Sequence, residues 1–248
     1  MPDPLTLEHR DGIAVLTLRA PERRNALTVA MARALIAACD EIDADAGIGA
    51  VVVCGEGAYF CAGGDRAALA AAGEDPAAPG AWADMGTIYE SFARVGRLEP
   101  PTIAAIRGGC VGAGTNLALA TDLRVVAQDA KLASGFLPIG LHPGGGHSLL
   151  LSRAAGRETA NAMQLFGATV SGARAVELGL AWAAVPADAV DATALELAAT
   201  PARDPELARR TARSMRTIAG PPALPWSAAL DLERASQMWS MRRKALAG

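Results

Sequence analysis

A glycine-rich turn at the start of a helix is the first place in this chain where chemistry is expected. The apolar run at residues 102–106 leads into Arg-Gly-Gly-Cys-Val-Gly-Ala-Gly at 107–114, and then into a helix that begins Thr-Asn-Leu at 115–117. Such a turn presents unpaired backbone N–H groups and the positive end of a helix dipole, so it stabilises an anion. Asn116 lies on the first helical turn, where an acid or base would serve that anion, and an amide does not transfer protons.

The other short motifs do not predict a nucleotide or metal site. The turn at 112–114 lacks the third glycine of a dinucleotide fingerprint, and residues 142–146 lack the Gly-Lys-Ser/Thr ending of a P-loop. The three histidines are too scattered to suggest metal ligation, so no metal is expected. Cysteines 39, 54, 61 and 110 have no CxxC spacing, which indicates reduced, buried thiols.

Composition limits the partners. The chain has 248 residues, of which 51% are hydrophobic and 20% charged, so it can bury a large core. A net charge of −3 gives no basic footprint for nucleic acid or an anionic membrane, and a small ligand fits better. The N-terminus has no basic stretch followed by an apolar run, and no 18 consecutive uncharged apolar residues occur. A cytoplasmic protein is therefore expected.

Strands and helices alternate in the first half of the chain. Hydrophobic patterning predicts a hairpin of strands at 5–8 and 13–18, and further strands at 50–54, 102–106 and 123–127. Helical spacing follows Thr28, which is expected to cap a helix that ends near 45. Two more helices are predicted over 85–95 and from the glycine turn to about 121. Residues 68–80, rich in Ala, Gly and Pro, are expected to form a mobile excursion beside the site.

The second half has a different character. From residue 147 the pattern is almost entirely helical, with segments at 148–155, 157–166 and 172–178 and longer helices from 188 onward. The fold class expected is α/β, with a sheet region followed by an all-helical C-terminal part.

Several motifs in fixed order resemble one family. The N-terminal loop Pro-Glu-Arg-Arg-Asn-Ala-Leu at 21–27 is similar to a CoA-contacting loop, and Phe-Cys-Ala-Gly-Gly-Asp at 60–65 to a first oxyanion-hole turn. Residues 103–122 resemble the second oxyanion strand and helix, and the match continues through 129–131, 140, 143–145 and 175–180. Over roughly residues 5–190, the chain resembles the crotonase family, the enoyl-CoA hydratase/isomerase superfamily.

The resemblance implies an architecture and a chemistry. The fold would be a crotonase-like spiral of ββα units over residues 1–190, which carries the acyl-CoA site, with a helical trimerisation region over 191–248. A homotrimer or hexamer is expected. The shared chemistry of lyases and isomerases in this family, including those of fatty acid metabolism, is stabilisation of an enolate at an acyl-CoA thioester. Coenzyme A is then part of the substrate, and no separate cofactor is expected.

The resemblance also assigns residues to the site. The two oxyanion donors would be the backbone N–H groups of Gly64 and Ala113, and glycine suits a close backbone approach because it has no Cβ. The expected substrate-binding residues are Arg24, Ala26, Ala62, Asp65, Asn116 and Phe136.

This sequence departs from the family's hydratases. The positions of their two glutamates correspond to Asn116 and Phe136, and neither is an acid. Because a positioned acid or base contributes about 10² to 10⁴ in rate, hydration is expected to be very slow unless other groups substitute. Phe136 also makes the pocket more apolar, which favours holding an acyl chain over activating water.

Three side chains are candidate substitutes. His142 lies on a loop that resembles one passing beside the acyl group, and it either carries protons or bonds the loop backbone. His147 either acts at the site or packs at the start of the next helix, and Asp65 either acts or holds its turn. Two hypotheses stay open: an enolate-forming enzyme with His142 or bound water as proton carrier, and a non-catalytic acyl-CoA-binding protein.

Overall fold

Two sheets make up the strand framework of the computed structural model, which describes residues 3–75 and 78–220. The larger sheet has the order β1-β2-β3-β5-β7-β10 and the smaller one β4-β6-β8-β9. Pairing is parallel except between β1 and β2 and between β8 and β9. The strands are β1 (Leu5–Arg10), β2 (Ile13–Leu18), β3 (Ala50–Gly55), β4 (Tyr59–Cys61), β5 (Thr102–Ile106), β6 (Gly109–Val111), β7 (Leu123–Ala127), β8 (Lys131–Ala133), β9 (Thr169–Ser171) and β10 (Ala183–Val185).

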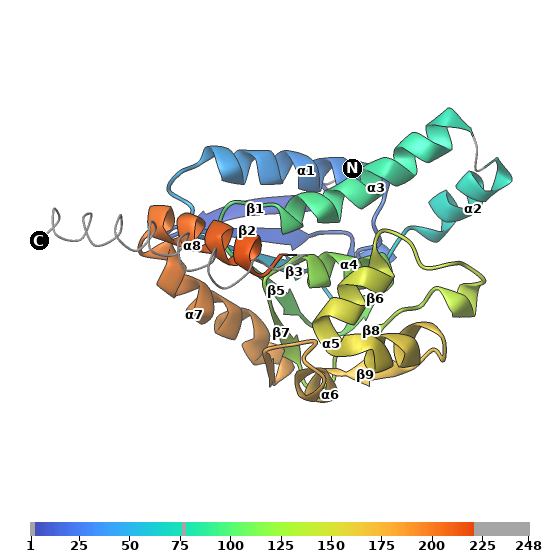
Figure 1. Ribbon diagram of the computed structural model, residues 1–248. Helices are drawn as coiled ribbons and strands as arrows, with labels where there is room; N and C mark the ends of the chain where they lie inside the picture. Colours follow the sequence, from blue (N-terminus) through green and yellow to red (C-terminus); the bar gives the residue numbers. More distant parts are fainter. Residues whose placement is uncertain (1–2, 76–77, 221–248) are drawn as a thin grey trace, which may run out of the picture.

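Helices surround these sheets (Figure 1). Helix α1 packs against β1, β2 and α3, whereas α7 packs across β3, β5 and β7. The helices are α1 (Val29–Ala44), α2 (Arg66–Glu74), α3 (Pro79–Gly96), α4 (Ala113–Ala120), α5 (His147–Gln164), α6 (Gly172–Glu177), α7 (Val190–Ala202) and α8 (Pro205–Ile218). Within residues 3–75 and 78–220, no helix is long and apolar enough to cross a bilayer.

The five strands predicted in the first half are confirmed, whereas the three-residue strands β4, β6 and β8 were not predicted, and β6 lies within the predicted glycine turn. Asp11 and Gly12 both have positive φ, which is the geometry of a tight hairpin turn, and they join β1 to β2. The Thr28 side chain caps α1 by accepting a hydrogen bond from the Met31 N–H at 3.2 Å. Every residue of β3 is buried, as its β-branched run indicates. All four cysteines are buried and free.

The excursion expected over 68–80 is partly wrong, because residues 66–74 form α2. The Asp65 carboxylate accepts a hydrogen bond from the Ala68 N–H at 3.0 Å, and an alanine-rich sequence follows that favours helix. Residues 76–77 lie outside the described part of the chain.

The second half contains two strands that patterning did not predict, β9 and β10. Each has three residues, and each exists by pairing with a strand formed earlier in the chain. The predicted break between 155 and 157 is confirmed by a non-helical Gly156 inside α5. The helical region expected over 191–248 is described to residue 220 as α7 and α8, and its remainder lies outside the described residues.

Candidate functional site

Parallel pairing of β4 with β6 brings the two glycine turns side by side. Cys61 pairs with Cys110, and each strand runs directly into its turn. A Cβ on Gly63 would lie 2.8 Å from the Val111 carbonyl oxygen and 3.4 Å from the Ala113 nitrogen, and Gly63 has φ +97°. A Cβ on Gly114 would overlap the Cys61 carbonyl. Glycine at these positions therefore allows the close contact between the turns.

The backbone N–H groups of Gly64 and Ala113 have no acceptor among the described residues, as is also the case for Gly114 and Thr115 in the first turn of α4. On either side of Gly64, the Leu27 N–H donates to the Gly63 oxygen at 2.7 Å and the Asp65 N–H to the Leu27 oxygen at 3.1 Å. Ala113 is the first residue of α4, so its N–H has no partner within the helix. The positive end of the α4 dipole therefore lies behind this donor.

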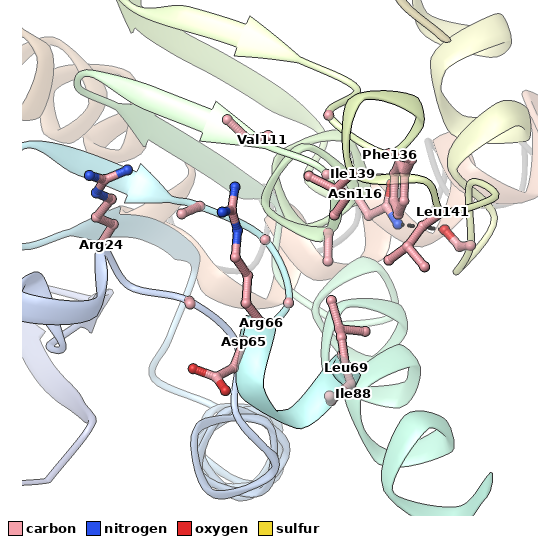
Figure 2. Close-up of a pocket in the computed structure, with 18 of the residues that line it drawn as sticks. Arg24, Asp65, Arg66, Leu69, Ile88, Val111, Asn116, Phe136, Ile139 and Leu141 are labelled. Atoms are coloured by element: carbon pink, nitrogen blue, oxygen red, sulfur yellow. Dashed lines mark hydrogen bonds between the residues drawn. The ribbon is translucent and has the colours of Figure 1, made fainter. Parts of the chain in front are cut away.

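Gly64 and Ala113 line one cavity of about 690 Å³, within the range of about 300 to 1,000 Å³ typical of small-molecule sites. Figure 2 shows Arg24 and Arg66 on one side of it and apolar side chains on the other. The apolar side includes Leu69, Ile88, Phe136, Ile139 and Leu141. Such a cavity suits a ligand with an anionic part and an apolar part.

The loop at 21–27 is fixed against the first glycine turn. The buried Asn25 accepts a hydrogen bond from the Ala20 N–H at 2.9 Å and donates to the carbonyls of Glu56 at 2.9 Å and Tyr59 at 2.7 Å. The Ala62 N–H donates to the Arg24 oxygen at 2.9 Å. These contacts place Arg24, Ala26 and Ala62 in the cavity wall.

Arginine side chains supply the positive charge. The Arg24 guanidinium lies 5.3 Å from the centroid of the Tyr59 ring, a cation–π distance. Arg66 lines the cavity with an exposed side chain that has no hydrogen bond or ion pair with the described residues. Sequence reasoning missed Arg66. The sequence feature that could have identified Arg66 is its position directly after Asp65, which caps α2.

Asp65 lines the cavity, but its carboxylate is engaged in capping α2. A second contact, 3.6 Å to Arg23, joins it to the 21–27 loop. Glu22 carries the other carboxylate among the described residues that line the cavity. The geometry agrees with the interpretation that Asp65 holds its turn.

Asn116 and Phe136, at the two positions where the family's hydratases carry glutamates, both line the cavity. Asn116 is 1% exposed, and its amide nitrogen donates to the Gly144 carbonyl at 3.0 Å. Its amide oxygen lies 2.7 Å from His147 Nδ1. Because the amide nitrogen faces a carbonyl, the oxygen accepts and His147 Nδ1 carries the hydrogen. Asn116 thus joins α4 to the loop that precedes α5.

His147 is the first residue of α5 and is 1% exposed. Burial lowers the pKa of this imidazole from its ordinary 6.5 to about 4, so the ring is neutral at pH 7. Its Nε2 is buried and has no hydrogen-bond partner among the described residues. The Phe136 ring packs against it edge-on, with the centroids 5.0 Å apart.

His142 also lines the cavity, on an exposed loop. Its Nδ1 donates a hydrogen bond to the Pro143 carbonyl at 2.7 Å. The interpretation of a loop histidine bonded to the backbone is therefore confirmed, and a role as proton carrier stays a prediction.

Known proteins share this sequence and fold. The family model described as enoyl-CoA hydratase/isomerase matches residues 8–242. The chain is 42% identical over 233 residues to a probable enoyl-CoA hydratase, EchA14, of Mycobacterium tuberculosis, covering 94% of this chain and 86% of that protein. It is 35% identical over 192 residues to the 1,2-epoxyphenylacetyl-CoA isomerase of Escherichia coli, covering 75% of this chain and 71% of that protein.

Solved structures agree. An enoyl-CoA hydratase from a Polaromonas species superposes with a TM-score of 0.86 at 29% identity, covering 96% of this chain and 91% of that one. A putative enoyl-CoA hydratase from Streptomyces coelicolor superposes with a TM-score of 0.86 at 30% identity, covering 98% of this chain and 88% of that one. The chain belongs to the enoyl-CoA hydratase/isomerase family of the crotonase superfamily, and the predicted crotonase fold is confirmed.

Proposed function

We propose that this protein binds an acyl-CoA thioester in the cavity and stabilises its enolate with the N–H groups of Gly64 and Ala113. The observation that carries the proposal is the pair of donors without acceptors, on adjoining turns that line one cavity. Removing a proton from the carbon beside a thioester puts negative charge on the thioester oxygen. Two preorganised donors, one of them backed by a helix dipole, suit that charge.

The charge distribution orients the ligand. The phosphates of coenzyme A lie toward Arg24 and Arg66, and the acyl chain lies toward the apolar side, between Phe136 and Leu69. Charge-assisted hydrogen bonds from arginine to phosphate are among the stronger polar contacts in proteins. The thioester then falls between these parts, beside the two glycine turns.

The wall residues favour proton relocation over addition of water. Asn116 uses its amide on Gly144 and His147, and Phe136 presents an aromatic ring. Neither side chain activates water as a carboxylate would. The proposed reaction class is isomerisation of an enoyl thioester, and efficient hydration is not expected.

A non-catalytic acyl-CoA-binding protein is the second candidate. The observation in its favour is that the carboxylate of Asp65 is engaged in capping a helix and no carboxylate stands at position 116 or 136. Calorimetric titration with a saturated acyl-CoA, together with assays of crotonyl-CoA hydration and 3-enoyl-CoA isomerisation, separates the two candidates. Tight binding without turnover selects the binding protein, and failure to bind any acyl-CoA contradicts both.

Ala113→Pro tests the oxyanion donor directly. Ala113 is the first residue of α4, where proline is tolerated, but the substitution removes the N–H and fills the space in front of it. Loss of such a donor costs about 3 kcal/mol, so turnover is expected to fall at least 100-fold. Ala113→Ser, which keeps the N–H, is the matched control. Equal turnover in the two folded variants would contradict the assignment.

The family resemblance also supports a homotrimer or hexamer as the assembly. Large apolar side chains exposed after α5 and α6 favour association: Leu165 is 58% exposed, Phe166 83% and Trp182 65%. Light scattering coupled to size-exclusion chromatography measures the state, and a monomer at micromolar concentration would contradict the proposal.

A further inference from the structure

One buried nitrogen behind the cavity wall calls for an explanation. Buried polar atoms nearly always have hydrogen-bond partners, and the exceptions in a native structure point to a function or to a missing ligand. His147 Nε2 is such an exception within the described part of the chain. The side chain is 99% buried, because its relative exposure is 1%.

The hydrogen-bond network fixes which nitrogen of His147 is basic. The Asn116 amide nitrogen donates to Gly144, so the amide oxygen accepts the Nδ1–H of His147. In the neutral ring the other nitrogen, Nε2, then carries the lone pair. An Asn–His pair therefore presents one basic nitrogen in a defined orientation.

This nitrogen lies one side chain behind the cavity wall. Asn116 and Phe136 both line the cavity, and both contact His147. Asn116 is three residues after Ala113 on α4, so the two lie on the same helical face. The imidazole therefore sits close to the proposed oxyanion donor, with the half-buried Phe136 ring beside it.

We propose that His147 is the proton carrier of this site and that Asn116 is its positioning residue. The inference rests on the proposed function, since it needs an acyl-CoA thioester held at Gly64 and Ala113. Entry of the acyl chain turns the Phe136 side chain away from the imidazole and lets the chain reach Nε2. His147 takes the place of His142 and bound water as the group that moves protons.

The proton transfer balances without a co-reactant. The Nε2 lone pair takes a proton from carbon 2 of a 3-enoyl thioester, and the C–H electron pair moves into the enolate, whose oxygen accepts from Gly64 and Ala113. The imidazolium then gives a proton to carbon 4, and the double bond moves to carbons 2 and 3. The product is a 2-enoyl thioester, and no water is consumed.

The surroundings make the carrier dependent on the substrate. Helix α4 contains no titratable residue, and the loop at 134–146 contributes only His142. Tyr89 of α3 packs on Gly144, and Arg153, the first charged residue of α5, is exposed. Burial is the cause of the lowered pKa, so the imidazolium gains a counter-charge only when the enolate forms beside it.

Deuterium exchange tests the proposal. A saturated acyl-CoA is incubated with the full chain in D₂O, and label at carbon 2 is measured by mass spectrometry. In His147→Gln, which has no basic nitrogen, we expect exchange at least 100-fold slower and an acyl-CoA dissociation constant within threefold of wild type. His9→Gln, on the remote strand β1, is the histidine control and should exchange as wild type does.

The outcomes separate this inference from the proposed function. Unchanged exchange in His147→Gln, or loss of exchange in His142→Ala alone, would overturn the role of His147 and leave the oxyanion site standing. Wild type that binds acyl-CoA but does not exchange would overturn it as well, in favour of the binding protein. If wild type binds no acyl-CoA, the proposed function itself fails.

Asn116→Asp gives a second test if His147→Gln does not fold. The wild-type kcat/KM is expected to fall with an acid limb near pH 4, where His147 gains its proton. A carboxylate at position 116 raises the pKa of His147 and moves this limb upward by at least one pH unit. An acid limb that does not move in Asn116→Asp would overturn the assignment.

Discussion

At the scale of single residues, Arg66 tests how the site holds coenzyme A. Its guanidinium lines the cavity without a partner among the described residues, so Arg66→Ala should leave the free energy of unfolding unchanged. Loss of one charge-assisted contact to phosphate, worth about 1.5 kcal/mol, is expected to weaken acyl-CoA binding about tenfold. Titration with the acyl-pantetheine thioester, which lacks the nucleotide phosphates, should show no such loss.

The matched control is Arg33→Ala on α1, whose nearest ion-pair contact is a long one, 4.0 Å to Asp84. It should bind acyl-CoA as wild type does. An equal loss of affinity for both thioesters in Arg66→Ala would show that this arginine does not contact the phosphates.

The sequence identifies the site residues better than it identifies their partners. The family resemblance assigns Gly64, Ala113 and Asn116 to the site, and all three line one cavity. The bond between Asn116 and His147 spans 31 positions of the chain and depends on how α4 packs against α5, which patterning does not specify. For the same reason, the sequence favoured His142, which is exposed, as the proton carrier. It favoured a packing role for His147, which is buried.

At the scale of elements, the stability of α2 depends on its N-terminal capping residue, Asp65. Asp65→Ala removes the cap on the Ala68 N–H and should lower the free energy of unfolding by about 1 kcal/mol. Because α2 carries Arg66 and Leu69 into the cavity, fraying of its first turn should also weaken acyl-CoA binding. Hydrogen exchange of residues 66–72 and calorimetric titration measure the two effects.

Asp65→Asn keeps a good capping side chain and is the matched control. It should retain the stability and exchange protection of wild type, although it loses the 3.6 Å ion pair with Arg23, which is half-exposed and contributes little. If Asp65→Asn were as unstable as Asp65→Ala, the charge and not the cap would be what α2 needs.

Helices and strands were predicted correctly where the local sequence pattern determines them. They were missed where a strand forms only by pairing with another strand. Long amphipathic helices such as α1 and buried strands such as β3 follow from periodicity and caps. The three-residue strands β9 and β10 carry too little pattern, and they exist because β8 and β7 offer them edges. In α2, Gly73 near the end of the helix and the prolines after it in the sequence masked an alanine-rich helix.

At the scale of the whole molecule, the buried His147 makes stability depend on pH. Its pKa is about 4 in the folded chain against 6.5 when unfolded, so the unfolded chain binds more protons between these values. The contribution of the neutral imidazole is therefore complete above pH 6.5, and it is lost as the pH falls from 6.5 through about 4. Over this pH window the free energy of unfolding is expected to fall by about 3 kcal/mol because of His147.

Urea unfolding of wild type and His147→Gln at pH 7, 5.5 and 4.5 measures this term. Carboxylates elsewhere titrate in both proteins, so the difference between the two pH slopes isolates the imidazole. Wild type should lose more stability on acidification than His147→Gln, with most of the difference arising below pH 6. Parallel slopes would mean that His147 is solvated or paired in the folded chain, and the basic nitrogen beside the cavity would then lose its structural support.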